Sequence, residues 1–235
     1  MGILFDAIND VINCGTNDDI MTENGALTMA FWCKPNSTGE GGTGCLSSRG
    51  STGLSGPHFV TTGTANLRFQ VNGSTTMTRI GTAGCITFGT YQHILLTWDG
   101  STTATNVHFY VNGSEISAYN QSSNGSGIAD NSGTTLQIGN RSSVAATFDG
   151  IISDVAYWNT ELNLDEIKLL ASSRKKYLPL QVRSLSLKRY FPLDDFPGGA
   201  TASGTNSIRD RGPISVHGTP VNSPVAVSEE SFSYS

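Results

Sequence analysis

The sequence predicts an all-β protein, a two-sheet antiparallel jelly-roll sandwich with one short helix and a C-terminal extension. Apolar and polar residues alternate with period two along most of the chain, which is typical of strands. Twenty-seven glycines indicate many turns, and only 14% of the residues are charged. With 235 residues, 37% of them hydrophobic, the chain can bury the core of one large domain. It contains no apolar run of the roughly 20 residues that span a bilayer.

The strands are predicted where apolar residues recur at every second position, because successive side chains of a strand point to opposite faces. The clearest runs are 27–33, with Leu, Met, Phe and Cys on one face, and 107–111, with two Val beside Phe109. Further strands are expected at 59–62, 66–71, 93–98, 135–138 and 151–158. Glycine-rich breaks separate these runs, as in a sandwich of many short strands.

Two turns repeat the residues Val-Asn-Gly-Ser at 71–74 and 111–114, each after an alternating run. Asn-Gly favours a type I′ turn, in which both central residues need a positive φ. The repeat therefore predicts two equivalent hairpins.

One helix is predicted within residues 159–170. Asn163 is suited to cap its N-terminus, and Glu166 three residues later completes a capping-box pattern. Leu164, Ile167 and Leu170 recur every third position. This spacing predicts a short amphipathic helix that lies on the sandwich.

The composition changes after residue 176, where six of the eight prolines occur. We therefore expect a sandwich domain at 1–175 and an extension at 176–235. Because proline stiffens a chain, the extension is expected to follow a defined path around its own domain or a neighbouring subunit. It is predicted to contain strands at 184–191 and 214–216.

Four segments occur in an order found in a known family: 4–11 beginning Leu-Phe-Asp, 27–35 ending Trp-Cys-Lys-Pro, 91–100 ending Thr-Trp-Asp-Gly, and 148–158 ending Tyr-Trp. Over residues 3–172 the chain resembles the laminin-G-like and pentraxin-like branch of the concanavalin A-like lectin fold, of the kind found in viral and bacterial surface proteins. The resemblance implies a jelly roll. It leaves several functions open, since the superfamily includes sugar lectins, calcium-dependent binders, glycoside hydrolases and virion components.

The residues do not fit an enzyme. Hydrolases of the resembled superfamily carry acidic residues as Glu-x-Asp-x-Glu on one strand face, and this triplet is absent from the sequence. A Gly-x-Ser-x-Gly motif and a phosphate-binding glycine loop are also absent. We predict no catalytic residue. The net charge of −5, with 14 basic residues spread thinly, argues against nucleic acid as a partner.

The four cysteines, Cys14, Cys33, Cys45 and Cys85, form no Cys-x-x-Cys pair. We expect buried free thiols, with one disulfide as the alternative, and no zinc site.

No cofactor is predicted, although the sequence leaves calcium open. Calcium requires several carboxylate and carbonyl oxygens. Predicted turns offer such oxygens at Asp6 with Asp10, at Asp18–Asp19 and at Asp130–Asn131. The alternative is that each of these residues forms a turn or caps a helix.

Trp32 and Tyr110 are the candidate ligand-binding residues. Each lies opposite the apolar face of its predicted strand, where an aromatic ring can stack on a sugar. Trp98 and Trp158 are expected in the core, and core packing is the alternative for Trp32 as well.

These features predict a non-catalytic structural or interaction protein on a virion surface, such as a head-decoration or fibre component. The start of the chain reads as a strand and not as a signal peptide, and the weakly charged surface and stiff extension suit contacts with neighbours. Its partners would be other copies of itself and a capsid or surface protein, without membrane insertion. The alternative is a stand-alone lectin or adhesin that binds glycans, with or without calcium, and reaches the cell exterior by a route other than Sec.

Overall fold

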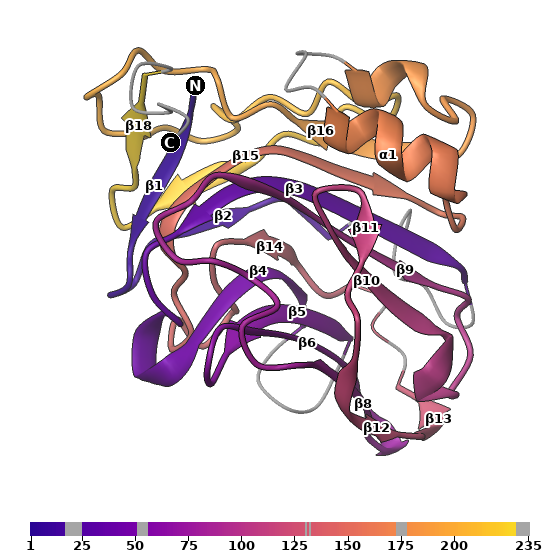
Figure 1. Cartoon of the computed structure of the whole chain (residues 1–235). Helices are drawn as coiled ribbons and strands as arrows, with labels where there is room; N and C mark the ends of the chain where they lie inside the picture. The colour runs from indigo at the N-terminus through magenta and orange to yellow at the C-terminus, as the bar shows by residue number, and fades with distance from the viewer. Residues whose placement is uncertain (17–24, 51–55, 130, 132, 173–177, 229–235) are drawn as a thin grey trace.

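Two large antiparallel sheets pack face to face in the computed structural model (Figure 1). The structure describes residues 1–16, 25–50, 56–129, 131, 133–172 and 178–228. The predicted all-β jelly-roll sandwich with a single helix is confirmed for these residues.

Sheet A has the strand order β11-β10-β9-β3-β15-β1-β18, with β16 also paired to β15. Its strands are β1 (Gly2–Asp6), β3 (Leu27–Pro35), β9 (Gln92–Trp98), β10 (Val107–Val111), β11 (Ser114–Glu115), β15 (Asp149–Trp158), β16 (Leu187–Phe191) and β18 (Val225–Val227).

Sheet B has the order β12-β8-β6-β5-β4-β14-β2-β17. Its strands are β2 (Val11–Asn13), β4 (Thr43–Arg49), β5 (Pro57–Thr62), β6 (Asn66–Val71), β8 (Met77–Gly81), β12 (Tyr119–Ser123), β14 (Leu136–Ile138) and β17 (Thr219–Val221). A small third sheet pairs β7 (Gly73–Thr75) with β13 (Ser126–Ile128). The remaining elements are helix α1 (Leu164–Ser172) and the 3-10 turns η1 (Glu40–Gly42), η2 (Ala104–Asn106) and η3 (Leu178–Gln181).

The main core lies between the sheets and is rich in aromatic rings. Phe31 of sheet A lies 6.0 Å from Phe59 of sheet B, measured between ring centroids, and Trp98 lies 5.5 Å from Phe69. The apolar faces predicted for 27–33 and 107–111 are buried here. All four cysteines are free thiols, as expected, and three of them are buried.

A second hydrophobic cluster covers the outer face of sheet A and is called the outer cluster below. It consists of Ala30, Leu95, Ala156, Trp158, Leu162, Ile167, Leu170, Leu178, Val182, Leu187 and Tyr190. These residues come from β3, β9, β15, α1, η3 and β16 and, for Leu162 and Val182, from the adjoining connections. Figure 1 shows β15, β16 and α1 near one another at the top of the view. The indole N–H of Trp158 donates to the carbonyl of Val182 at 2.8 Å. Helix and extension are therefore packed onto sheet A.

The predicted capping box is present at the start of α1. The backbone N–H of Glu166 donates to Oδ1 of Asn163 at 3.0 Å, and the N–H of Asn163 donates to Oε2 of Glu166 at 2.8 Å. Ile167 and Leu170 are buried as predicted. Leu164, in contrast, is 48% exposed, because it is the first residue of the helix and precedes the turn that contacts the outer cluster. α1 is too short to span a membrane, and the part of the chain that the structure describes contains no other α-helix.

The two Asn-Gly turns differ, so the prediction of equivalent hairpins is wrong. Asn112 and Gly113 have φ of 50° and 79° and join β10 to β11, as a type I′ turn requires. Asn72 is buried instead, and Gly73 begins β7. A Cβ atom on Gly73 would lie 2.3 Å from the carbonyl oxygen of Gly127, so the close pairing of β7 with β13 requires glycine here.

The described part of the extension adds strands to both sheets, since β16 pairs with β15, β18 with β1, and β17 with β2. The strand predicted at 184–191 is present in part, as β16. The strand predicted at 214–216 is absent. Ser215 has φ of 54°, which interrupts an extended backbone, and the N–H of Val216 binds the Asp210 carboxylate.

Asp210 connects this irregular segment to β16. Its carboxylate accepts the N–H groups of Tyr190 at 2.9 Å, Gly212 at 2.8 Å and Val216 at 3.2 Å. It also faces the guanidinium of Arg189 at 3.5 Å, and both side chains are almost fully buried. Buried polar groups are costly to leave without partners, so this carboxylate holds the extension on the sandwich.

We predict that Asp210→Ala lowers the free energy of unfolding by about 3 kcal/mol or more, because it leaves Arg189 and three N–H groups buried without this acceptor. Arg209→Ala is the control. The Arg209 side chain is 68% exposed and lies 3.9 Å from Asp195, and we expect a loss of at most about 1 kcal/mol. Urea unfolding followed by fluorescence measures both, and equal losses would show that Asp210 does not anchor the extension.

Candidate ligand-binding site

A row of polar side chains crosses the outer face of sheet B from the edge strand β12 to β2, the neighbour of the other edge strand. The residues are paired in register between neighbouring strands, and because side chains alternate along each strand they share one face. This polar row consists of Asn13, Gln137, Ser48, His58, Gln70, Thr78 and Ser123.

Side-chain hydrogen bonds join the members of the polar row in pairs. The contacts are Gln137 Nε2 to Asn13 Oδ1 at 2.9 Å, Ser48 Oγ with His58 Nδ1 at 2.9 Å, and Gln70 Nε2 to Thr78 Oγ1 at 3.1 Å. The row consists of amides, hydroxyls and one imidazole, which can each donate and accept hydrogen bonds. Such a surface suits a ligand that is rich in hydroxyl groups.

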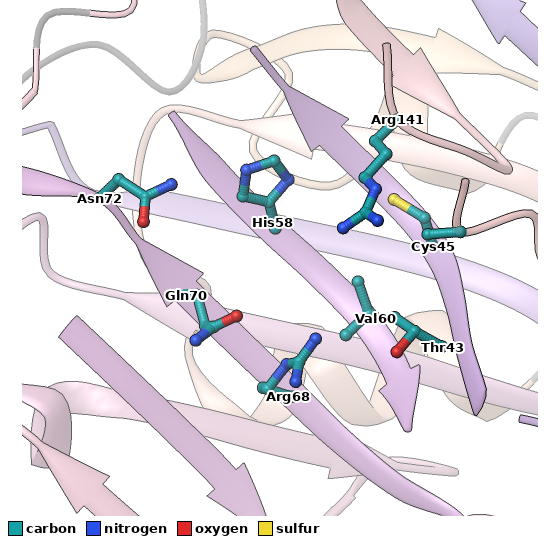
Figure 2. A pocket seen from close by; sticks show the side chains of 9 residues that line it. Thr43, Cys45, His58, Val60, Arg68, Gln70, Asn72 and Arg141 are labelled. Carbon is teal, nitrogen blue, oxygen red and sulfur yellow. The ribbon is translucent and has the colours of Figure 1, made fainter. Parts of the chain in front are cut away.

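A pocket of about 100 Å³ lies beside the centre of the polar row (Figure 2). It is lined by Thr43, Cys45, His58, Val60, Arg68, Gln70, Asn72, Arg141 and Ala146. Its apolar side is a small buried cluster of Cys45, Val60 and Ala146. Figure 2 shows the guanidinium groups of Arg68 and Arg141 directed toward the middle of the pocket from opposite sides.

Arg68 reaches the pocket from the middle of β6, whereas Arg141 comes from the connection between β14 and β15. The Arg141 side chain donates from Nε to Oγ of Ser143 at 3.1 Å and from Nη2 to the Ala145 carbonyl at 3.0 Å. Val144 between them has φ of 51°, a disfavoured conformation for a β-branched residue. The N–H of Val144 closes the turn on the Arg141 carbonyl at 2.8 Å. A strained but closed turn thus positions Arg141.

The pocket is cationic at neutral pH. Burial, together with the smaller effects of the charges on Arg141 and Arg68, lowers the pKa of His58 to about 4. Burial and the neighbouring Arg141 also lower the pKa of Arg68. Burial raises the pKa of the Cys45 thiol to about 12, against the effect of the two arginines. The described lining therefore combines two guanidinium groups with a neutral imidazole and a neutral thiol, and it contains no carboxylate.

Two of the groups that line the pocket have polar atoms without a hydrogen-bond partner. Nε of Arg68 and Nε2 of His58 are buried, and neither contacts a donor or acceptor in the described structure. A buried polar atom without a partner costs about 1–3 kcal/mol. An oxygen-rich ligand in the pocket would supply the missing acceptors.

A second, more open cavity of about 320 Å³ lies near the β10–β11 hairpin, lined by residues 82–85, 111 and 114–117. Its one charged group in the described lining is Glu115, which already binds His108 at 2.7 Å and the Tyr119 hydroxyl at 3.0 Å. The unpartnered donors are at the other pocket, so that pocket is the stronger candidate.

The sequence matches the family model described as the concanavalin A-like lectin/glucanases superfamily over residues 9–168, more than half of the chain. The chain belongs to this superfamily. Among curated protein sequences, none matches this concanavalin A-like domain.

Solved structures share the fold of this concanavalin A-like domain at low sequence identity. A proposed carbohydrate-binding protein from Bacteroides ovatus matches with a TM-score of 0.60 and 16% identity, over 97% of this chain and 61% of that protein. The CBM40 domain of the Ruminococcus gnavus IT-sialidase, bound to α2,3-sialyllactose, matches with a TM-score of 0.52 and 18% identity, over 72% of this chain and 96% of that domain. Tailspike protein 2 of the Escherichia coli O157:H7 bacteriophage CAB120 matches with a TM-score of 0.56 and 16% identity, over 83% of this chain and 27% of that protein. The chain thus spans only part of the first and third proteins.

Trp32 and Tyr110 both lie on the outer face of sheet A, but in different surroundings. Trp32 is half-buried, and its ring stacks on Tyr91 at 6.0 Å between centroids and contacts His93 at 5.3 Å. Tyr110 lies two strands away on β10, in register with Leu95 and Ala30 and not with Trp32, and packs against the outer cluster. The concanavalin A-like domain therefore does not bring these two rings together in one site.

Among the described residues, His, Cys, Asp and Glu side chains do not gather in groups of three or more that could hold a metal ion. Asp10 and Asp6 act within their own turn, where Asp10 Oδ2 accepts the N–H of Asp6 at 3.2 Å and Asp6 Oδ1 accepts the N–H of Ile8 at 2.9 Å. Asp18, Asp19 and Asp130 lie outside the described residues.

The sequence analysis missed the residues of this pocket, although a signal for them exists. His58, Arg68 and Gln70 each sit one position from a buried apolar residue in a run with period two. Assigning both faces of every predicted strand would have collected these polar residues on one face. Arg141 gives no such signal, because it lies in an irregular connection.

We predict that His58 makes the domain less stable as the pH falls from 6.5 to 4. In this range the unfolded chain gains a proton on His58, whose ordinary pKa is 6.5, while the folded chain, with a pKa of about 4, does not. Relative to the wild type, His58→Gln should therefore gain about 2 kcal/mol of unfolding free energy between pH 7 and pH 4.5. Urea unfolding at both pH values measures this gain, and an NMR titration of the wild-type imidazole checks it. If the difference in unfolding free energy between His58→Gln and the wild type is the same at both pH values, the assigned pKa is wrong.

Proposed function

We propose that this concanavalin A-like domain is a non-catalytic carbohydrate-binding module and that the outer face of sheet B binds the glycan. The observation that carries the proposal is the hydrogen-bonded polar row beside a pocket with a buried, unpartnered donor, Nε of Arg68, and a second buried polar atom without a partner, Nε2 of His58. Hydroxyl groups of a sugar can accept from such donors and donate to the amide and hydroxyl oxygens of the row. The fold is shared with a CBM40 domain that binds sialyllactose, which is consistent with this role.

The chemistry of the described cavities supports binding without hydrolysis. Glycoside hydrolysis requires two carboxyl groups on either side of the scissile bond, roughly 5–10 Å apart. The described lining of the pocket contains no carboxylate, and that of the open cavity contains only Glu115. The described pocket thus has hydrogen-bonding groups that can hold a sugar, and its described lining lacks the pair of carboxyl groups that would cleave it.

We predict that the purified chain binds glycans on an array and that Gln70→Ala weakens the tightest interaction about 3- to 10-fold, as expected for the loss of one or two neutral hydrogen bonds. Gln70 lines the pocket and is half-buried, so its removal should leave the core intact. Trp32→Ala tests the competing site on sheet A and should leave binding unchanged. Chelation of calcium should also have no effect, because the described pocket offers no carboxylate ligand.

Calorimetry with the best glycan measures the affinity of each variant, and thermal unfolding confirms that each is folded. Binding that is lost in Trp32→Ala and kept in Gln70→Ala would place the site on sheet A. Binding that requires calcium would point to a different set of ligands. The absence of any glycan ligand would contradict the proposed function.

We further propose that the module acts on the exterior of a virion, with a cell surface reached by a non-Sec route as the alternative. The weak charge of the chain, 14% charged residues, suits packing against neighbouring copies or a capsid or surface protein. The bacteriophage tailspike protein that shares the fold gives a precedent for such a domain in a phage protein.

We predict that the full chain forms a homo-oligomer, because a virion component of this kind contacts other copies of itself. Light scattering after size exclusion measures the molar mass in solution. The full chain is required, since the described extension contributes Phe191, Leu193 and Ile208 to the main core of the sandwich. A monomer of 24.8 kDa at micromolar concentration would contradict self-association.

A further inference from the structure

Building on the proposed function, we infer that the pocket between Arg68 and Arg141 recognises the acidic group of a glycan, a carboxylate or a sulfate. The glycan ligand would then be an acidic saccharide, with its charged group in the pocket and its neutral hydroxyls over the polar row. This inference specifies the class of ligand for the site proposed above.

The charges around the pocket are not balanced by the protein. Arg68 and Arg141 are directed toward one another (Figure 2), and like charges at such a site repel. No carboxylate is found among the described lining residues. The chain as a whole has a net charge of −5, so this local positive charge runs against its overall composition. A bound anion would neutralise it.

The donors in the pocket match an anionic group better than a neutral one. Nε of Arg68 is buried without an acceptor, and Arg141 is held by Ser143 and Ala145 with its guanidinium toward the pocket. In the tautomer that carries its proton on Nε2, His58 adds a third donor. Guanidinium groups form strong paired hydrogen bonds with planar oxyanions. Two guanidinium groups without a carboxylate in the described lining therefore select for oxyanions.

The size of the pocket limits which part of a ligand can enter. Sites that enclose a whole drug-sized molecule measure about 300–1,000 Å³. A pocket of about 100 Å³ holds only a substituent, and its apolar side of Cys45, Val60 and Ala146 can take no hydroxyl hydrogen bond. The sugar ring itself would lie outside, where Gln70 and Thr78 continue the polar row. A sugar ring that carries a carboxylate or sulfate could place this group in the pocket and keep the ring on the polar row outside it.

Matched pairs of oligosaccharides test the inference. One pair is a uronic-acid oligosaccharide and its carboxyl-reduced form, and the other is a sulfated oligosaccharide and its desulfated form. The wild type should bind one acidic member roughly 10- to 100-fold more tightly than its neutral partner, as expected for charged hydrogen bonds. Arg68→Gln and Arg141→Gln should each remove most of this preference. Arg209→Gln removes the same charge from an exposed site on the extension and should leave it unchanged.

Calorimetry measures the affinities, and the NMR signal of the His58 ring reports whether the acidic group enters the pocket. A preference in only one pair identifies the anion as carboxylate or sulfate. Equal affinity for acidic and neutral members, unaffected by Arg68→Gln, would overturn the inference and leave the glycan-binding function standing. A shift of the His58 signal with inorganic sulfate but no binding of any oligosaccharide would overturn both, and would identify an anion site of another kind.

Discussion

The burial of Trp158 on the outer face of sheet A determines how the rest of the molecule is arranged. A β-sandwich has two faces turned away from its core, and both are open to ligands unless something covers them. Here Trp158, its hydrogen bond to Val182 and the outer cluster use a large part of one face to hold α1 and the extension. The polar row occupies the opposite outer face, across sheet B. One sheet thus holds the helix and the extension, and the other carries the proposed binding face.

On sheet B, stability and recognition make opposite demands on the same residues. Arg68 and His58 are held in the folded state with buried polar atoms unpartnered and with pKa values lowered by burial and by neighbouring charge. Each of these features reduces the stability of the unliganded protein. The burial of the large aromatic core between the sheets offsets this loss of stability. Preorganised donors also bind more tightly, because the ligand does not have to order them.

The fold was predictable from local patterns, whereas of the site only the outward-facing residues of single strands were. Alternation located β3 and β10 and their buried faces, and Asn163 with Glu166 marked the start of α1. Such signals depend on residues close in sequence. The pocket joins β4, β5, β6 and a distant connection, and no pattern within one strand reveals which strands become neighbours. The prediction of two equivalent Asn-Gly hairpins was wrong for a similar reason. The conformation of Gly73 depends on β13, a strand distant in sequence with which it pairs.

The different origins of the two arginines explain how such a face could change its ligand without changing its fold. Arg68 stands on a central strand, where its neighbours Leu67 and Phe69 point into the core and fix the backbone. Arg141 lies on a connection that contains the strained Val144, whose N–H donates to the Arg141 carbonyl. The buried amide oxygen of Asn140 accepts the N–H groups of Arg141 and Ala146 at the two ends of this turn. Connections tolerate replacement better than core strands. At the proposed site, the strands therefore supply a fixed cation and a row of neutral hydrogen-bonding groups, while the connection supplies the second cation and would thereby set the class of ligand.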